Sequence, residues 1–235
     1  MNTTLQLHVV LLAAMLWNLT ACERRTDANA QEPPSTPAAT PKKVETTPAP
    51  TPAPSSKSVS LKLGDRAPML REKMRNVDGE MVTIESSAGA RGTLVIFTCN
   101  HCPWSQAWEG RIAKLGNTYD PRGIGVVAIN SNDPSVFPID GFEAMQARAR
   151  QLSLEFPYAM DVTSNIARAY GAKKTPEVYL FDAEQRLVYH GAVDDNPDIA
   201  DVSQHFLKDA LDALLADQPV EVAETRAIGC SIKFR

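Results

Sequence analysis

Two cysteines separated by two residues have the clearest chemical potential in this chain. Cys99 and Cys102 lie within the stretch Phe97–Trp104, and the whole chain of 235 residues contains only four cysteines. A CxxC pair can accept electrons as a disulfide, and when it is reduced one thiolate can attack a partner disulfide while the other resolves the mixed disulfide. The spacing therefore predicts a redox pair in which Cys99 attacks and Cys102 resolves.

The surroundings of the pair favour a reactive thiolate. An apolar strand over 92–97 precedes the pair and a helix follows it, so the first cysteine is expected at the helix N-terminus. Free backbone N–H groups and the helix dipole favour an anion there, which would lower the pKa of Cys99. Pro103 suits a first helical turn. His101, between the cysteines, can stabilise the thiolate and so make the disulfide a stronger oxidant.

Other roles for the cysteines stay open. A structural disulfide between close neighbours would constrain little chain, and a zinc site needs about four ligands. A copper-binding module is a further alternative, with four possible ligands: Cys99, Cys102, His101 and the distant His190. The redox pair is favoured, with no cofactor and no metal expected. For Cys230, near the C-terminus, an inert or buried cysteine is favoured over a third redox thiol.

Strands and helices alternate along residues 61–235. Apolar, β-branched runs predict strands at 92–97, 124–130, 156–160, 177–181 and 186–190. Helices are predicted after the cysteine pair, ending at Gly116–Asn117, then after Asp140 as N-cap, and over 166–170 and 202–215. An alternating pattern that ends in a hairpin and a helix predicts an α/β fold with a mixed sheet.

Several short blocks resemble known families. The block Phe97–Trp104 after a strand, together with Thr175-Pro176 at the start of a later strand, resembles the thioredoxin-like superfamily. Within it, residues 61–235 look like AhpC/TSA-type redoxins and TlpA/ResA-like thiol–disulfide oxidoreductases. The blocks that carry this narrower resemblance are Gly64–Pro68, Val127–Asp133, Thr175–Asp182, Tyr189–Gly191 and Gly229–Phe234.

The resemblance implies a fold and a set of roles. The fold would be thioredoxin-like, a mixed β-sheet flanked by helices with a redoxin-type βα insertion. Cys99 matches the exposed nucleophile and Cys102 the resolving thiol, while Pro176 matches a cis-proline beside the disulfide, preceded by Thr175. His101 matches the histidine of disulfide-isomerase and disulfide-oxidase sites. The implied partners are protein thiols or disulfides, held partly by backbone pairing near Pro176, and a redox partner.

The sequence also departs from these families. Thr93 stands where thioredoxin has a buried acid, six residues before the first cysteine. The peroxiredoxin pattern P-x-x-x-T-x-x-C, counted back from Cys99, meets Ile96 and Gly92 instead. A thiol peroxidase therefore remains only an alternative. The reaction direction stays open, because the motif histidine favours oxidation and the TlpA/ResA resemblance favours reduction.

The N-terminal sequence predicts a signal peptide and a lipid anchor. Residues 1–21 carry no Asp, Glu, Lys or Arg and contain the apolar run Val9–Trp17, which is typical of a signal peptide. Leu19–Cys22 resembles a bacterial lipobox, in which Cys22 is lipidated, although residues before the apolar run lack Lys and Arg. An ordinary cleaved signal or a misassigned start codon on a cytoplasmic protein are the alternatives.

The organisation predicted from these patterns has three parts. A signal peptide occupies 1–21, a disordered tether rich in Pro, Thr and Ser occupies 22–60, and a redoxin domain occupies 61–235. The protein would be a membrane-anchored lipoprotein of the cell envelope, facing the periplasm or the extracytoplasmic space. The net charge is −4 and the basic residues do not cluster, so no nucleic-acid partner is expected.

Overall fold

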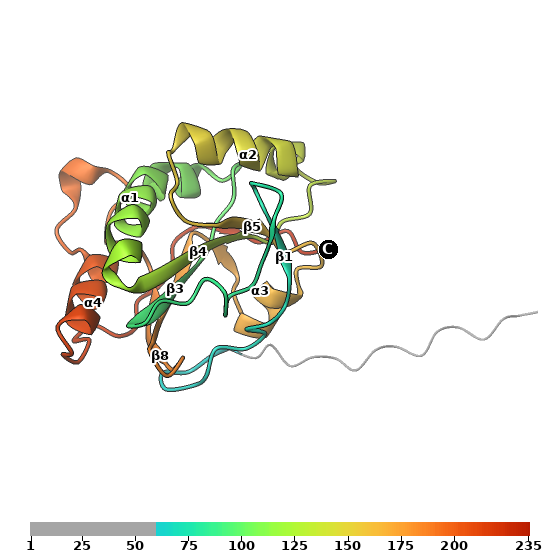
Figure 1. Ribbon diagram of the computed structural model, residues 1–235. Helices are drawn as coiled ribbons and strands as arrows, with labels where there is room; N and C mark the ends of the chain where they lie inside the picture. Colours follow the sequence, from blue (N-terminus) through green and yellow to red (C-terminus); the bar gives the residue numbers. More distant parts are fainter. Residues whose placement is uncertain (1–59) are drawn as a thin grey trace, which may run out of the picture. The chain divides into compact units, whose positions relative to one another are not determined.

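Two parallel strands lie at the centre of the sheet (Figure 1), in a computed structural model that describes residues 60–235. β3 (Gly92–Phe97) pairs with β4 (Ile124–Asn130), and every residue of both strands is buried. Apolar, β-branched sequence suits strands that are covered on both faces. Both strands have the bounds that the sequence predicted.

Five further strands complete a seven-stranded mixed sheet. They are β1 (Met74–Asn76), β2 (Met81–Val82), β5 (Tyr158–Met160), β7 (Glu177–Asp182) and β8 (Leu187–Gly191). The strand order is β2-β1-β5-β4-β3-β7-β8, and β7 and β8 form the predicted antiparallel hairpin. The α/β architecture with a mixed sheet is therefore confirmed.

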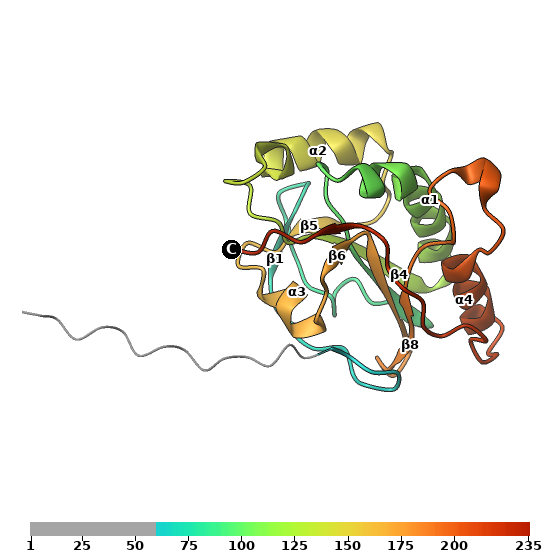
Figure 2. The same ribbon diagram turned by 180° about the vertical axis from the view of Figure 1, so that it is seen from behind.

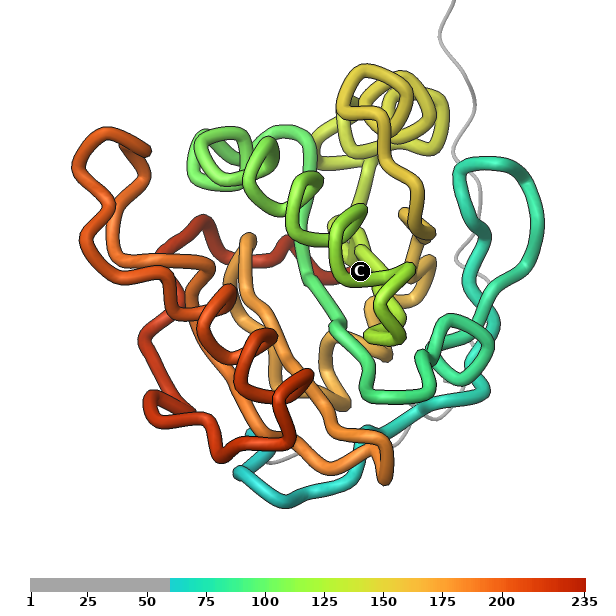
Figure 3. The backbone as a smooth tube through the Cα atoms, turned by 60° about the vertical axis from the view of Figure 1, so that its left-hand side comes forward, coloured from blue at the N-terminus to red at the C-terminus, as the bar shows by residue number. Residues whose placement is uncertain are grey.

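Helices cover both faces of the sheet. One face packs against α1 (Pro103–Tyr119), α2 (Phe142–Gln151) and α4 (Phe206–Leu215), and Figure 3 brings α1 and α4 toward the viewer. The other face packs against α3 (Asn165–Tyr170) and the chain that leads into the sheet. Because side chains alternate along a strand, Leu94 and Val95 enter different clusters.

An extra helix and strand lie between β4 and α3. α2 leads into β5, which runs parallel to β4 and antiparallel to β1, so that it separates these two strands in the sheet. This unit corresponds to the βα insertion that the family resemblance implied.

Helix ends differ from the sequence-based expectations. α1 continues to Tyr119 instead of ending at Gly116, because that glycine serves packing: a Cβ there would lie 2.0 Å from the ring of Phe156. α2 has Gly141 as its N-cap, so the predicted cap at Asp140 is wrong. α4 begins at Phe206, four residues later than predicted.

A second, two-stranded sheet was not predicted. β6 (Lys174–Thr175) pairs antiparallel with β9 (Cys230–Ser231), with Thr175 opposite Cys230. The peptide bond between Thr175 and Pro176 is cis. Figure 2 shows the C-terminal segment, in dark red, crossing the molecule beside β6.

The predictions for the N-terminus lie outside the described residues. These are the signal peptide at 1–21, the tether at 22–60 except for its last residue, and lipidation of Cys22. Within residues 60–235, no helix combines the length and the apolar character that crossing a membrane requires.

Candidate active site

The cysteine pair lies where β3 ends and α1 begins. The helix starts at Pro103 with Cys102 as its N-cap, so the second cysteine occupies the helix N-terminus that was expected for the first. Cys99 lies three residues earlier. Both cysteines are free thiols and both are buried, with exposed fractions of 3% for Cys99 and 0% for Cys102. The exposed nucleophile that the family resemblance implied is therefore covered here.

Thr175 lies against both active-site sulfurs. Its hydroxyl oxygen is 3.1 Å from Cys99 Sγ, and its carbonyl oxygen is 3.2 Å from Cys102 Sγ, from which it accepts a hydrogen bond when Cys102 is protonated. Two further groups surround the pair. Ser105 Oγ lies 3.8 Å from Cys99 Sγ, and the backbone N–H of Cys230 donates to Cys102 Sγ at 3.4 Å.

The two thiols titrate as a pair. A hydrogen bond with Cys102 raises the pKa of Cys99 well above its usual range, and burial adds to the effect. The same hydrogen bond lowers the pKa of Cys102 to about 4. Hydrogen bonds from Cys230 and from the backbone N–H of Ser105 also favour the Cys102 thiolate. At neutral pH the pair shares one proton and carries one negative charge. The expected low pKa therefore belongs to Cys102.

His101 is held by a buried carboxylate. Its Nδ1 lies 2.5 Å from Oδ2 of Asp140, which has no exposed surface. The carboxylate also accepts hydrogen bonds from the backbone N–H groups of Asn100 and His101 and from the side-chain amide of Asn132. The imidazole stacks on Phe137 with ring centroids 3.9 Å apart. Its position next to the cysteines is thus fixed on several sides.

Side-chain atoms that could bind a metal ion lie close together at Cys99, His101 and Asp140. Ligand atoms of Cys99, His101 and Asp140 all lie within 4.8 Å of one another. The negative charge of Asp140 contributes to the raised pKa of Cys99. His190, the fourth ligand of the copper alternative, pairs elsewhere: its Nε2 lies 2.8 Å from Oε1 of Glu177. In the copper alternative, the fourth ligand is thus engaged in another contact.

A buried glutamate fixes the strand that carries Thr175. Glu177 accepts hydrogen bonds at 2.8 Å from the backbone N–H groups of Lys173 and Lys174. Burial acts to raise the pKa of Glu177, but the hydrogen bond with His190 and the two backbone hydrogen bonds outweigh it, and the pKa lies below its ordinary value. The charged carboxylate therefore holds β6 against the sheet.

Sequence reasoning missed several of these contacts. Asp140 was assigned as a helix cap, and no role was assigned to Asn132, Glu177 or Ser105. Asn132 and Glu177 do lie inside blocks that carried the family resemblance, Val127–Asp133 and Thr175–Asp182. The resemblance of those blocks to a family was the sequence feature that could have pointed to Asn132 and Glu177. The contacts of Asp140 with Asn100 and His101 span 40 and 39 positions, and the contact of Asn132 with Lys233 spans 101.

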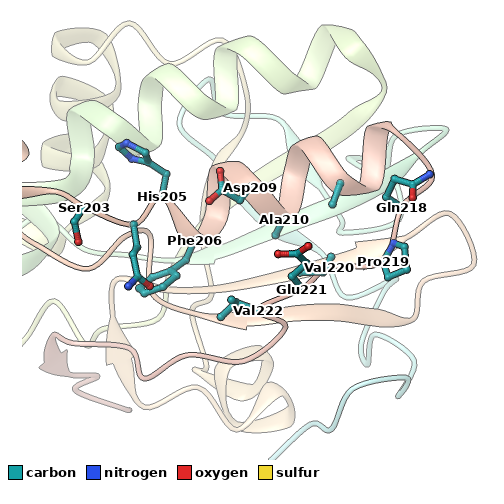
Figure 4. Close-up of a pocket in the computed structure, with 12 residues that line it drawn as sticks. Ser203, His205, Phe206, Asp209, Ala210, Gln218, Pro219, Val220, Glu221 and Val222 are labelled. Atoms are coloured by element: carbon teal, nitrogen blue, oxygen red, sulfur yellow. The ribbon is translucent and has the colours of Figure 1, made fainter.

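Hollows in the surface differ in their relation to the cysteines. A cavity of about 30 Å³ touches Cys99 and is also lined by Glu109 and Arg148, whose side chains form an ion pair at 2.6 Å. A hollow of about 600 Å³ lies between α4 and residues 218–222 (Figure 4). Its lining contains no cysteine, so it is separate from the dithiol site.

The sequence matches one protein family along more than half of the chain. The profile of the AhpC/TSA family matches residues 63–190. A thiol-disulfide oxidoreductase ResA from Halalkalibacterium halodurans is 24% identical over 115 residues. The match covers 49% of this chain and 61% of that protein, so the chain spans less than two thirds of this relative.

Solved structures show the same fold. An uncharacterised conserved protein from Geobacillus kaustophilus is 39% identical, with a TM-score of 0.70 over 74% of this chain and 93% of that one. A structure from Chlorobium tepidum described as a thiol:disulfide interchange protein DsbE is 24% identical. Its TM-score is 0.51 over 66% of this chain and 99% of that chain. These likenesses show a thioredoxin-like fold.

Proposed function

The chain belongs to the AhpC/TSA family, and from this premise we propose that it is a thiol–disulfide oxidoreductase. It would exchange electrons between the Cys99–Cys102 pair and protein thiols or disulfides. The observation that carries the proposal is the contact of Thr175 with both sulfurs, next to the cis bond to Pro176. The similarity to a protein named as a ResA thiol-disulfide oxidoreductase also supports it.

The roles of the two cysteines follow from their burial and charge. Cys102 is enclosed and carries the negative charge of the reduced pair, while Cys99 keeps a small exposed fraction. Transfer of the shared proton from Cys99 to Cys102 gives the Cys99 thiolate, which attacks a sulfur of the substrate disulfide and releases the other sulfur as a thiolate. That thiolate takes the proton from Cys102 and leaves as a thiol. The Cys102 thiolate then attacks Cys99 Sγ, which breaks the mixed disulfide, releases the second substrate sulfur as a thiolate and leaves the Cys99–Cys102 disulfide.

His101 and Asp140 act as positioning residues in this proposal. The carboxylate orients the imidazole, and ligand atoms of both groups lie within 4.8 Å of the sulfur of Cys99. A ring nitrogen that donates a hydrogen bond to the carboxylate draws on its negative charge and so reduces the repulsion that Asp140 exerts on a developing Cys99 thiolate. Pro103 contributes by allowing the helix, and with it Cys102, to begin immediately after the pair.

The proposed location is the cell envelope, outside the cytoplasm. The apolar run Val9–Trp17 and the lipobox-like Leu19–Cys22 support a membrane-anchored lipoprotein. Protein thiols or disulfides would be its substrates, and a second redox protein would regenerate the pair. The proposed location rests on residues 9–22, which lie outside the described residues.

Insulin reduction by dithiothreitol tests the proposed activity. The purified full chain is expected to accelerate insulin precipitation, and Cys99→Ser is expected to return the rate to that of dithiothreitol alone, because no mixed disulfide can form at that position. Cys22→Ser is the matched control, since it makes the same chemical change 77 positions before Cys99 in the sequence. Equal rates for the wild-type chain and Cys99→Ser would refute the proposal.

A thiol peroxidase is the second candidate. The family match and the low pKa of Cys102 at a helix N-terminus favour it. Counted back from Cys102, however, the peroxiredoxin pattern meets Cys99 and Val95 in place of its threonine and proline. Hydrogen peroxide consumption that requires Cys102 and exceeds the rate of insulin reduction would establish this candidate over the first.

A further inference from the structure

The C-terminal strand places a third cysteine against the active-site pair. Cys230 lies opposite Thr175 in the β6–β9 ladder, and its backbone nitrogen is 3.4 Å from Cys102 Sγ. Besides burial, the neighbouring Cys102 side chain also contributes to a raised pKa of the Cys230 thiol. The thiols of Cys99, Cys102 and Cys230 therefore form one cluster, although Cys102 and Cys230 are 128 positions apart in the sequence.

The segment after Cys230 is held along its length. The backbone N–H of Ile232 donates to the carbonyl of Lys173 at 3.0 Å, and the Ile232 side chain is buried in the core. The N–H of Lys233 donates to Asn132 Oδ1 at 2.7 Å, and the carbonyl of Lys233 accepts from Asp133 at 2.7 Å. Such a network fixes the position of the thiol, in contrast to a frayed chain end.

The residue before Cys230 is fitted to close contact with β6. A Cβ atom on Gly229 would lie 2.2 Å from the carbonyl oxygen of Thr175. Only glycine allows the two backbones to approach this closely. The Gly229–Cys230 pair thus brings a thiol to the residue that touches both active-site sulfurs.

This position is also where a substrate was expected. The sequence predicted that a substrate backbone would pair near Pro176, and β9 occupies the strand edge at Thr175, immediately before that proline. The chain therefore presents its own cysteine where a substrate strand would lie. This reading rests on the proposed function, because it treats Cys230 as an internal substrate of the pair.

We propose that Cys230 is a third redox residue, which exchanges with the oxidised pair to form a Cys102–Cys230 disulfide. The Cys230 thiolate attacks Cys102 Sγ, the Cys102–Cys230 bond forms, and the Cys99–Cys102 bond breaks. Cys99 leaves as a thiolate and takes up the proton that Cys230 released. One disulfide and one thiol exist before and after the step, so it needs no external oxidant.

The electrostatics of the cluster make the step depend on the redox state of the pair. In the reduced state, burial and then the hydrogen bond and negative charge of Cys102 raise the pKa of Cys230 to about 11. Cys230 is therefore a neutral thiol while the pair is reduced. Oxidation of the pair removes the charge of Cys102, which removes part of the cause of the raised pKa. Cys230 then forms a thiolate more readily.

Peptide mapping of the oxidised full chain tests the proposal. Trypsin releases residues 92–111, with both Cys99 and Cys102, and residues 227–233, with Cys230. The chain is oxidised with diamide, quenched in acid, alkylated and digested. The expected wild-type sample contains the cross-linked peptides 92–111 and 227–233 as well as the internally oxidised peptide 92–111. A wild-type sample with only the internal Cys99–Cys102 disulfide would overturn the proposal.

Two variants assign the bond. Cys99→Ser is expected to give the cross-linked peptides in nearly all molecules, since Cys102 has no other partner, whereas Cys102→Ser is expected to lose the cross-link at least tenfold. Thermal unfolding of both variants checks that they are folded. If folded Cys99→Ser keeps Cys102 and Cys230 alkylated after oxidation, or if Cys102→Ser gives the cross-link, the assignment fails.

The same samples separate this inference from the proposed function. Insulin reduction that depends on Cys99, without a cross-link, would support the proposed function and refute the role of Cys230. A Cys102–Cys230 bond without accelerated insulin reduction would support a reactive three-cysteine cluster and refute the proposed function.

Discussion

At the scale of single residues, the charge of the reduced site lies on Cys102. Its position as helix N-cap places it among free backbone N–H groups, and Cys99 and Cys230 donate hydrogen bonds to it. An isolated cysteine loses its proton near about pH 8.5. A pKa of about 4 therefore keeps the pair singly charged across the physiological range. A stabilised thiolate favours the reduced form and makes the disulfide a stronger oxidant.

Titration of the reduced chain tests this charge. The ultraviolet absorbance of the thiolate is expected to be present at neutral pH and to be lost as the pH falls through about 4, because the lowered pKa of Cys102 keeps the thiolate charged above that value. Absorbance needs no reagent to reach the buried sulfur. Cys102→Ser should remove this low-pH step and leave the thiolates that form in alkaline solution. A first thiolate that appears only near pH 8 would contradict the prediction.

At the scale of elements, the site depends on three segments that meet. β3 and α1 carry the cysteines, β6 supplies Thr175, and β9 covers the pair from the far end of the chain. Glu177 fixes β6 through the N–H groups that precede Thr175. We therefore expect the pairing of β6 with β9 to control how accessible Cys99 and Cys102 are to solvent.

Gly229→Ala tests the role of the pairing between β6 and β9. The added Cβ would lie 2.2 Å from the Thr175 backbone, so β9 has to move away from β6, at a cost of about 1–3 kcal/mol in the free energy of unfolding. The displaced strand should also make the pair react faster with a maleimide. Urea unfolding and the alkylation rate measure the two effects.

Gly110→Ala is the matched control. Gly110 is exposed within α1, and a Cβ there meets no atom within 4 Å. Alanine is favoured over glycine in a helix, so this variant should gain about 0.5–1 kcal/mol with no change in alkylation. If the two variants have the same stability and reactivity, β9 does not cover the pair in solution.

At the scale of the whole molecule, the chain combines a folded redox domain with an N-terminal region of different composition. Residues 60–235 carry the sheet, the helices and the three-cysteine cluster. Residues 1–59 carry the apolar run, the lipobox-like motif and the sequence rich in Pro, Thr and Ser. Lipidation of Cys22 would restrict the redox domain to substrates near a membrane surface.

Mass spectrometry of the mature protein tests the anchor. When the chain is made in a bacterium that processes lipoproteins, the mature N-terminus is expected at Cys22, with the mass of the attached lipid, and the protein should enter the membrane fraction. Cys22→Ser should abolish the added mass and move the protein to the aqueous fraction. A wild-type N-terminus with unmodified Cys22, or one from which Cys22 is absent, would refute the anchor.

The sequence by itself determined the two central strands and predicted a redox chemistry for the cysteine pair. Short apolar runs define β3 and β4 to the residue, since a buried strand needs continuous apolar sequence, and the CxxC spacing predicts the redox cysteines. A sequence pattern covers only a few neighbouring residues. It therefore predicts a structural feature correctly when the cause of that feature is local. The same limit explains the errors at Gly116 and Asp140, whose roles depend on Phe156 and His101.

Only the tertiary structure decided how the site is charged and covered. The low pKa at Cys102, the carboxylate behind His101 and the strand that brings Cys230 to Thr175 all join residues from distant parts of the chain. No local pattern encodes such contacts, because they arise when β6 and β9 pair and when the 3₁₀ segment Pro138–Asp140 folds over the start of α1. The sequence predicted the reactive cysteines, and folding set the direction in which the pKa of each one is shifted.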